Sequence, residues 1–244
     1  MIYTAFASMY DEFMQDIPYE KWGIYITKML RKHLPSKEDI LVADLACGTG
    51  TMTIFLAKQG FDMIGVDMSY DMLAAAQQKA YEEKQNILFL AQKVQELDLF
   101  GTADAMVSVC DGLNYILNEE ELAAAFKKVS LFLNPGGIFI FDMNTEYKFK
   151  ELLGCKSFEG DSQSGSSYEW DNFYSEETQI NEYRVQFFKE KSESYTEVHK
   201  QRAYSPETVV AHLKNAGFCD VSVYHEYTDQ PPKPDSLRLT FLAQ

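Results

Sequence analysis

The sequence lacks the cysteine patterns that build disulfide frameworks and zinc sites. It has four cysteines, widely spaced, with no C-x-x-C pair and no pairing with a nearby histidine: Cys47, Cys110, Cys155 and Cys219. Its four histidines show no metal-ligand spacing either: His33, His199, His212 and His225. We therefore predict reduced thiols and no metal site.

Basic residues are also few. The chain has 22 lysines and arginines against 37 acids, for a formal net charge of −15. A field of that sign repels phosphate backbones and anionic lipid, so it disfavours nucleic acid as a main partner. No apolar run is long enough to span a bilayer, and Asp11, Glu12 and Asp16 do not fit a signal peptide. We expect a cytoplasmic protein without membrane contact, and nothing indicates its oligomeric state.

The residues that are present suit a large folded domain, since 46% of the 244 are hydrophobic. An amphipathic helical stretch covers residues 1–34, and strands and helices then alternate. Strands are expected at 40–45, 62–67, 87–92, 104–110 and 138–144, and helices at 51–60, 70–84 and 118–133, with a turn at 134–137. Apolar strands joined by helices indicate an α/β fold with a doubly wound parallel sheet.

That alternation stops after residue 144. The polar, Gly/Ser-rich residues 158–167 predict a loop. We expect three antiparallel strands next, within 168–174, 178–190 and 194–204. A helix that begins at Ser205 should follow within 205–218, and two last strands within 219–227 and 236–242. The sequence thus predicts a core of residues 1–144 and 205–244, with a small antiparallel β insertion at 145–204.

The turn after the first predicted strand is rich in glycine. Dinucleotide-binding enzymes place G-x-G-x-x-G there, so that the backbone can approach a pyrophosphate. Gly48 and Gly50 match this pattern, but Thr53 replaces the third glycine, which argues against an NAD-dependent oxidoreductase. The glycine pair alone would fit a tight turn without a ligand equally well.

Two acids mark the ends of the first two predicted strands. Asp44 precedes the glycine turn, where a carboxylate would oppose a pyrophosphate but suits a ligand that carries an amine. Asp67 ends the second strand and can accept hydrogen bonds from both hydroxyls of a ribose. The pair indicates a nucleoside with a cationic, amino-bearing tail.

Four motifs then occur in a familiar order: "VADLACGTG", "GVDMS", "CDGLNYI" and "NPGGIFIFDMN". In these the chain resembles the class I S-adenosylmethionine-dependent methyltransferases, over most of its length. The first residues and the inserted strands are similar to a bacterial, small-molecule-type subgroup. The resemblance implies a seven-stranded, mostly parallel Rossmann-like sheet. It also implies S-adenosyl-L-methionine as cofactor and S-adenosyl-L-homocysteine as product.

The resemblance also implies the residues that contact the cofactor. Asp44 would lie near its amino group, Asp67 at the ribose, and Met68 on the adenine. The usual acid after the third strand is missing, so Gln92 would accept from the adenine amino group and Val94 would cover the ring. The full implied set is Tyr10, Trp22, Asp44, Ala46, Gly48, Gly50, Asp67, Met68, Gln92, Val94, Cys110 and Asn114.

Methyl transfer to nitrogen or oxygen requires a proton to leave the acceptor, which calls for a base. The candidates near the expected cleft are Asp111, Tyr115, Tyr10 and His199. The insertion should lie over the carboxyl ends of the strands, where ligands bind in this architecture, and act as a substrate lid. An unidentified small molecule is the expected acceptor.

Two alternatives stay open at this point. The chain could bind the cofactor or its product as a regulatory ligand without turnover, a hypothesis that the missing adenine acid favours. It could also be an RNA or protein methyltransferase, although its acidity disfavours RNA.

Overall fold

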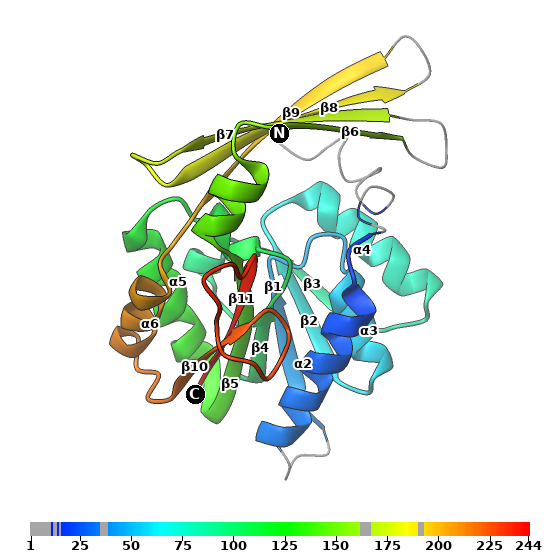
Figure 1. Ribbon diagram of the computed structural model, residues 1–244. Coiled ribbons are helices and arrows are strands. Elements are labelled where there is room, and N and C mark those ends of the chain that lie inside the picture. The colour runs from blue at the N-terminus through cyan, green and yellow to red at the C-terminus, as the bar shows by residue number, and fades with distance from the viewer. Residues whose placement is uncertain (1–10, 12–13, 15, 35–38, 162–166, 190–192) are drawn as a thin grey trace.

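Two β-sheets organise the chain in this computed structural model, which describes residues 11, 14, 16–34, 39–161, 167–189 and 193–244. The larger sheet has seven strands in the order β10-β11-β5-β4-β1-β2-β3 (Figure 1). Its strands are β1 (Leu41–Leu45), β2 (Asp62–Asp67), β3 (Leu88–Ala91), β4 (Ala103–Ser108), β5 (Leu133–Asn144), β10 (Val221–His225) and β11 (Arg238–Ala243). β1 to β5 pair in parallel, and β11 pairs antiparallel with both of its neighbours.

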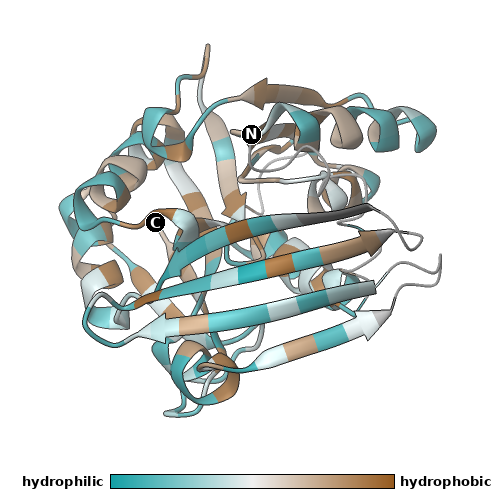
Figure 2. Ribbon diagram, turned by 90° about the horizontal axis from the view of Figure 1, so that it is seen from above, coloured by the Kyte–Doolittle hydropathy of each residue, from teal (hydrophilic) through white to brown (hydrophobic). Residues whose placement is uncertain are grey.

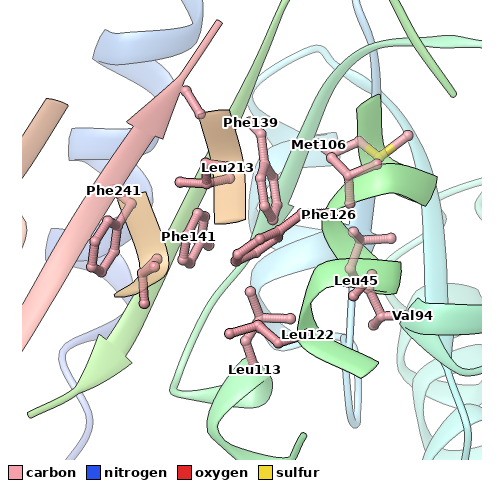
Figure 3. Packing of buried hydrophobic residues seen from close by; sticks show 14 of the residues in the cluster. Leu45, Val94, Met106, Leu113, Leu122, Phe126, Phe139, Phe141, Leu213 and Phe241 are labelled. Carbon is pink, nitrogen blue, oxygen red and sulfur yellow. The ribbon is translucent and has the colours of Figure 1, made fainter. Parts of the chain in front are cut away.

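Helices cover both faces of this sheet, as the alternating pattern predicts (Figure 1). They are α2 (Tyr19–His33), α3 (Thr51–Lys58), α4 (Tyr70–Glu82), α5 (Glu119–Phe132) and α6 (Pro206–Asn215), with short η1 (Val94–Glu96), η2 (Gly112–Tyr115) and η3 (Lys148–Leu153). On one face, Phe126 of α5 packs against Phe139 and Phe141 of β5 (Figure 3). On the other face, Ile26 of α2 packs in a second cluster. The seven-stranded α/β fold is therefore confirmed.

Three helix starts are fixed by side chains that the sequence supplies at the preceding position. Ser69 accepts a hydrogen bond from Met72 N at the start of α4. Asn118 and Ser205 do the same for α5 and α6. Each cap pairs one of the backbone N–H groups that the first helical turn leaves without a partner.

The smaller sheet lies across the carboxyl edge of the large one (Figures 1 and 2). It is fully antiparallel, in the order β6-β7-β8-β9, and consists of β6 (Ser157–Asp161), β7 (Ser167–Ser175), β8 (Ile180–Lys189) and β9 (Glu193–Arg202). Hydrophobic and hydrophilic residues alternate along its strands (Figure 2). Its aromatic face includes Tyr168, Trp170, Tyr183 and the buried Phe187.

The predicted loop at 158–167 is wrong over its first residues. Ser157–Asp161 form β6, which pairs with β7 and gives the small sheet a fourth strand. Phe158 packs on Trp170 across this pair, and Tyr168 occupies the space over Gly160. Cross-strand aromatic packing thus overrides a polar, glycine-containing composition.

The predicted turn at 134–137 belongs to the strand ladder instead. β5 begins at Leu133, which pairs with Ala103, and the register shifts before Ala105 pairs with Ile138. Gly136 has a φ of 78° within this irregular stretch. The motif thus forms a bulged start of β5 rather than a separate turn. Among the described residues, no helix is long and apolar enough to cross a membrane.

Candidate functional site

The glycine turn after β1 contains three residues with positive φ, a conformation that glycine adopts readily. Gly48 and Gly50 have φ values of 54° and 74°, and Ala46 has a φ of 56°. A Cβ on Gly50 would lie 3.0 Å from the Ala76 side chain on α4, so this glycine also permits close packing. The turn therefore brings backbone N–H groups to the carboxyl end of β1.

Asp67 at the end of β2 fixes this turn. Its carboxylate accepts hydrogen bonds of 2.8 Å from Gly48 N and from Ser69 N. Burial raises the pKa of Asp67, and these backbone hydrogen bonds oppose that rise. The side chain joins the turns after β1 and β2 into one surface.

Asp44 at the end of β1 is 1% exposed. Its carboxylate accepts a 2.6 Å hydrogen bond from the Thr53 hydroxyl. Burial raises the pKa of Asp44 to about 7, and the neighbouring Asp67 carboxylate adds to the rise. A cationic group in front of this carboxylate would favour its ionised form.

One cavity runs along the carboxyl edge from β3 to β4. Nine of the residues expected at the site line it together: Asp44, Ala46, Gly48, Asp67, Met68, Gln92, Val94, Cys110 and Tyr115. The sequence did not single out Tyr19 of α2 or Gln95 of η1, which also line it. The cavity combines buried carboxylates with apolar side chains and backbone N–H groups.

The turn after β4 holds two consecutive left-handed residues, Cys110 with a φ of 64° and Asp111 with a φ of 56°. Asp142 of β5, fully buried, accepts hydrogen bonds from the backbone N–H of both, at 2.7 and 3.0 Å. Burial raises the pKa of the Cys110 thiol to about 11, so the cavity presents a thiol rather than a thiolate.

Asp111 is engaged by other residues rather than by the cavity. Arg238 of β11 lies 2.7 Å from one carboxylate oxygen, and Gln201 of β9 donates a 2.5 Å hydrogen bond to the other. Arg238 also pairs with Asp142. This buried network ties the turn after β4 to both sheets.

Tyr115 at the end of η2 contacts the small sheet. Its hydroxyl hydrogen-bonds with the Tyr183 hydroxyl of β8 and lies 3.4 Å from His199 Nδ1 of β9. His199 is 2% exposed, and its Nε2 lies 3.2 Å from a carboxylate oxygen of Glu197. Two of the candidate bases, Tyr115 and His199, are thus brought together.

Trp22 and Asn114, which were also expected at the cofactor, are buried and contact other parts of the fold. Trp22 is buried, stacks on Tyr227 at 4.8 Å and lies under the Arg238 guanidinium. Asn114, also buried, donates to the carbonyls of Asn144 and Arg202 and accepts from Asn144 N. These contacts use the polar atoms of Asn114 within the fold, and neither Trp22 nor Asn114 lines the cavity. Tyr10 lies outside the described residues.

The Gln92 amide is already paired within the chain. It lines the cavity, but its amide oxygen accepts from Asp98 N at 2.9 Å and its amide nitrogen donates to Asp98 O at 3.0 Å. The side chain therefore closes the loop after β3, and its expected contact with adenine stays a prediction. Gly50, expected at the cofactor, immediately precedes α3 and does not line the cavity.

Asp142, Glu197, Gln201 and Arg238 were missed by sequence reasoning. All four are polar, buried residues within strands. A polar residue inside an apolar strand is the signal that could have found Asp142, in "IFIFDMN". No group of three or more potential metal ligands occurs in the part of the chain that the structure describes.

Residues 42–137 match a family model described as a methyltransferase domain. Over its whole length the chain is 40% identical to "Putative methyltransferase YqeM" of Bacillus subtilis, and the match covers 97% of that protein.

Two solved structures share the fold. One is an S-adenosylmethionine-dependent methyltransferase from Clostridium acetobutylicum, with a TM-score of 0.88, 29% identity, and coverage of 99% of this chain and 98% of that one. The other is the sugar N-methyltransferase KedS8 from Streptoalloteichus, with a TM-score of 0.79, 20% identity, and coverage of 96% and 91%.

Proposed function

Because the chain belongs to the S-adenosylmethionine-dependent methyltransferases, we propose that it methylates a nitrogen or oxygen atom of a small molecule. One observation carries this proposal. A single cavity joins the carboxylates at the ends of β1 and β2 to Tyr115, which contacts the small sheet. The cavity thereby offers a nucleoside site at one end and an acceptor site at the other.

The two carboxylates that line the cavity fit the amino group and the ribose of S-adenosylmethionine. Asp44 is a buried carboxylate whose ionised form a cationic amino group would stabilise. Asp67 presents a carboxylate to the ribose hydroxyls, and the backbone N–H groups that it accepts from keep its orientation fixed. When bound, this cofactor supplies a methyl group on positively charged sulfur.

We assign the adenine to the surface formed by the turns after β2 and β3. Val94 is buried and apolar, Met68 is exposed beside it, and both line the cavity. Gln95 lines the same cavity. We propose that its amide contacts the adenine amino group, in place of the acid that the resemblance leads one to expect after the third strand. Gln92 supports this surface through Asp98.

At the other end, Cys110 and Tyr115 line the cavity and would lie nearest the methyl group and the acceptor. The segment 145–204 would then act as a lid and form part of the acceptor pocket, because β8 and β9 reach the cavity through Tyr115. Holding the acceptor in line contributes about 7 to 11 kcal/mol in well-oriented reactions. The fold shared with the sugar N-methyltransferase KedS8 favours an amine as the acceptor group.

The test combines binding with transfer. Isothermal titration with S-adenosylhomocysteine should show one site, and wild-type protein should move a labelled methyl group to some member of a panel of small amines and hydroxyl compounds. Binding without transfer to any acceptor would indicate a regulatory protein. Transfer to RNA or protein but to no small molecule would also overturn the proposal.

A further inference from the structure

The Tyr115 hydroxyl connects the cavity to buried groups on the small sheet. Tyr115 lines the cavity, and its hydroxyl hydrogen-bonds with Tyr183 of β8. The same hydroxyl lies 3.4 Å from His199 Nδ1 of β9. A proton that reaches Tyr115 from the cavity therefore has an acceptor directly behind it.

Glu197 lies on the far side of the His199 ring. Side chains two residues apart in a strand share a face, so Glu197 and His199 both point toward η2. Glu197 is 8% exposed, and its carboxylate oxygen lies 3.2 Å from His199 Nε2. The order of groups is Tyr115, His199 and Glu197, from the cavity inward.

This arrangement favours one of the two neutral tautomers of the His199 imidazole. A carboxylate beside Nε2 favours the tautomer that carries its proton there, which leaves Nδ1 as a hydrogen-bond acceptor toward Tyr115. Tyr183 stacks on the His199 ring with centroids 4.9 Å apart and an angle of 12° between the planes. Two neighbouring elements thus hold the ring, η2 through Tyr115 and β8 through Tyr183, and the Glu197 carboxylate lies beside Nε2.

We propose that Tyr115 and His199 form a proton relay for the methylation of an acceptor that carries an N–H or O–H group, with Glu197 as a positioning residue. This inference rests on the proposed function. It deepens that function by naming the base and by limiting the acceptor to primary or secondary amines and hydroxyl compounds.

The proton balance of the step is complete. The lone pair of the acceptor forms the bond to the methyl carbon, and sulfur keeps the electron pair of the bond that breaks. The acceptor proton passes to the Tyr115 oxygen while the Tyr115 proton passes to His199 Nδ1. The positive charge then resides on His199 beside the Glu197 carboxylate, until water takes the proton.

Asp111, which was also a candidate base, and two further titratable side chains near it are less suited to this role. Asp111 accepts from Arg238 with one oxygen and from Gln201 with the other. Burial keeps the Cys110 thiol protonated at neutral pH, since its pKa is raised to about 11. Asp142 is fully buried and paired with Arg238, away from the cavity lining.

The first test needs no acceptor. In the full-length protein labelled with ¹⁵N-histidine, the His199 signals are assigned by their loss in His199→Asn. The relay predicts that the neutral form of the ring carries its proton on Nε2, that the Nδ1 shift changes in Tyr115→Phe, and that Glu197→Leu gives a mixture of tautomers. A wild-type ring with its proton on Nδ1 would overturn the proposal.

The second test uses the amine or hydroxyl compound that the wild type methylates fastest. Tyr115→Phe and Glu197→Leu should lower kcat, by about 100-fold for Tyr115→Phe, while KM and S-adenosylhomocysteine affinity change little. Glu197→Gln, which keeps a hydrogen-bond acceptor, should recover part of the loss. Tyr174→Phe is the matched control, because the Tyr174 hydroxyl bonds to Glu146.

The two proposals fail in different ways. Wild-type protein that transfers no methyl group to any amine or hydroxyl compound removes the proposed function, and the relay with it. Wild-type transfer together with an unchanged kcat in Tyr115→Phe removes the relay alone. A tertiary amine methylated as fast as the matching secondary amine also contradicts the relay, because it has no proton to give.

Discussion

Asp142 of β5 accepts a 2.7 Å hydrogen bond from the backbone N–H of Cys110, at the turn after β4. A second bond runs from Asp111 N to the other oxygen of the same carboxylate, so two left-handed residues are held in sequence. Non-glycine residues in that conformation are strained, and they persist where the surrounding structure fixes them. One buried side chain therefore sets the wall of the cavity next to Tyr115.

Asp142→Asn should destabilise the protein strongly. The change leaves Arg238 buried without its partner on β5 and offers an amide N–H₂ to backbone donors. Breaking a buried pair in this way costs about 3 to 5 kcal/mol. Thermal unfolding should therefore shift down by roughly 6 to 20 °C. The control is Asp229→Asn in the exposed pair with Lys28, which should barely move the midpoint. Equal shifts for the two variants would contradict this assignment.

Asp44→Asn should change how the stability of the ligand-free protein depends on pH. Burial raises the pKa of Asp44 to about 7, so between its ordinary value and 7 the folded state binds more protons than the unfolded state. Stability from this group is therefore lost as pH rises through that window. The variant should unfold at a higher temperature than wild type at pH 8 and at a similar one at pH 4. Asp220→Asn, on an exposed side chain, is the control. A difference that is constant with pH would refute the assignment.

Asp67→Asn should weaken S-adenosylhomocysteine binding. An asparagine can accept at only one of the two positions that Gly48 N and Ser69 N now contact, so the glycine turn loses a support. Hydrogen bonds to charged groups contribute about 1.5 to 3 kcal/mol, which corresponds to roughly a 10- to 100-fold rise in Kd. Isothermal titration calorimetry measures this Kd. The control is Asp62→Asn, at an exposed position at the other end of β2. Unchanged affinity in Asp67→Asn would place the ribose elsewhere.

Lys79→Met should also reduce cofactor affinity, but by less. The Lys79 ammonium on α4 lies 2.7 Å from Asp11, 3.1 Å from Thr49 and 2.8 Å from Thr51, so it ties the glycine turn to Asp11. The pair with Asp11 is partly exposed, and such pairs contribute about 0.2 to 1 kcal/mol. Titration at low and high salt should show a difference that shrinks as salt screens the pair. Lys58→Met, which removes the exposed pair with Glu83, should leave affinity unchanged.

Much of the fold follows from local patterns. The expected strand at 62–67 matches β2 residue for residue, and Ser69, Asn118 and Ser205 cap the helices that follow them. β6 was missed because its ladder with β7 depends on Phe158 meeting Trp170 on the neighbouring strand, across a polar, Gly/Ser-rich connection. Periodicity reports on one strand at a time and carries no information about cross-strand partners.

The sequence also predicted only part of the candidate site. The sequence located Asp44, Gly48 and Asp67 because they lie at or just after the carboxyl ends of strands, which must meet at one edge of a parallel sheet. Asn114 was assigned to the cofactor from its motif and Trp22 from the N-terminal helical stretch, and tertiary contacts give both residues other partners. Polar side chains take whichever partner the fold brings within reach, and burial obliges them to find one.

The sequence by itself therefore determined the doubly wound sheet, the glycine turn and the two acids that front it, because each depends on residues close together in the chain. Only the tertiary structure decided that Asp142 and Arg238 would brace the turn after β4, and that Tyr115, His199 and Glu197 would line up behind the cavity. Tyr115 and His199 lie 84 residues apart. They meet because the small sheet folds back over the carboxyl edge, and no local spacing encodes that contact.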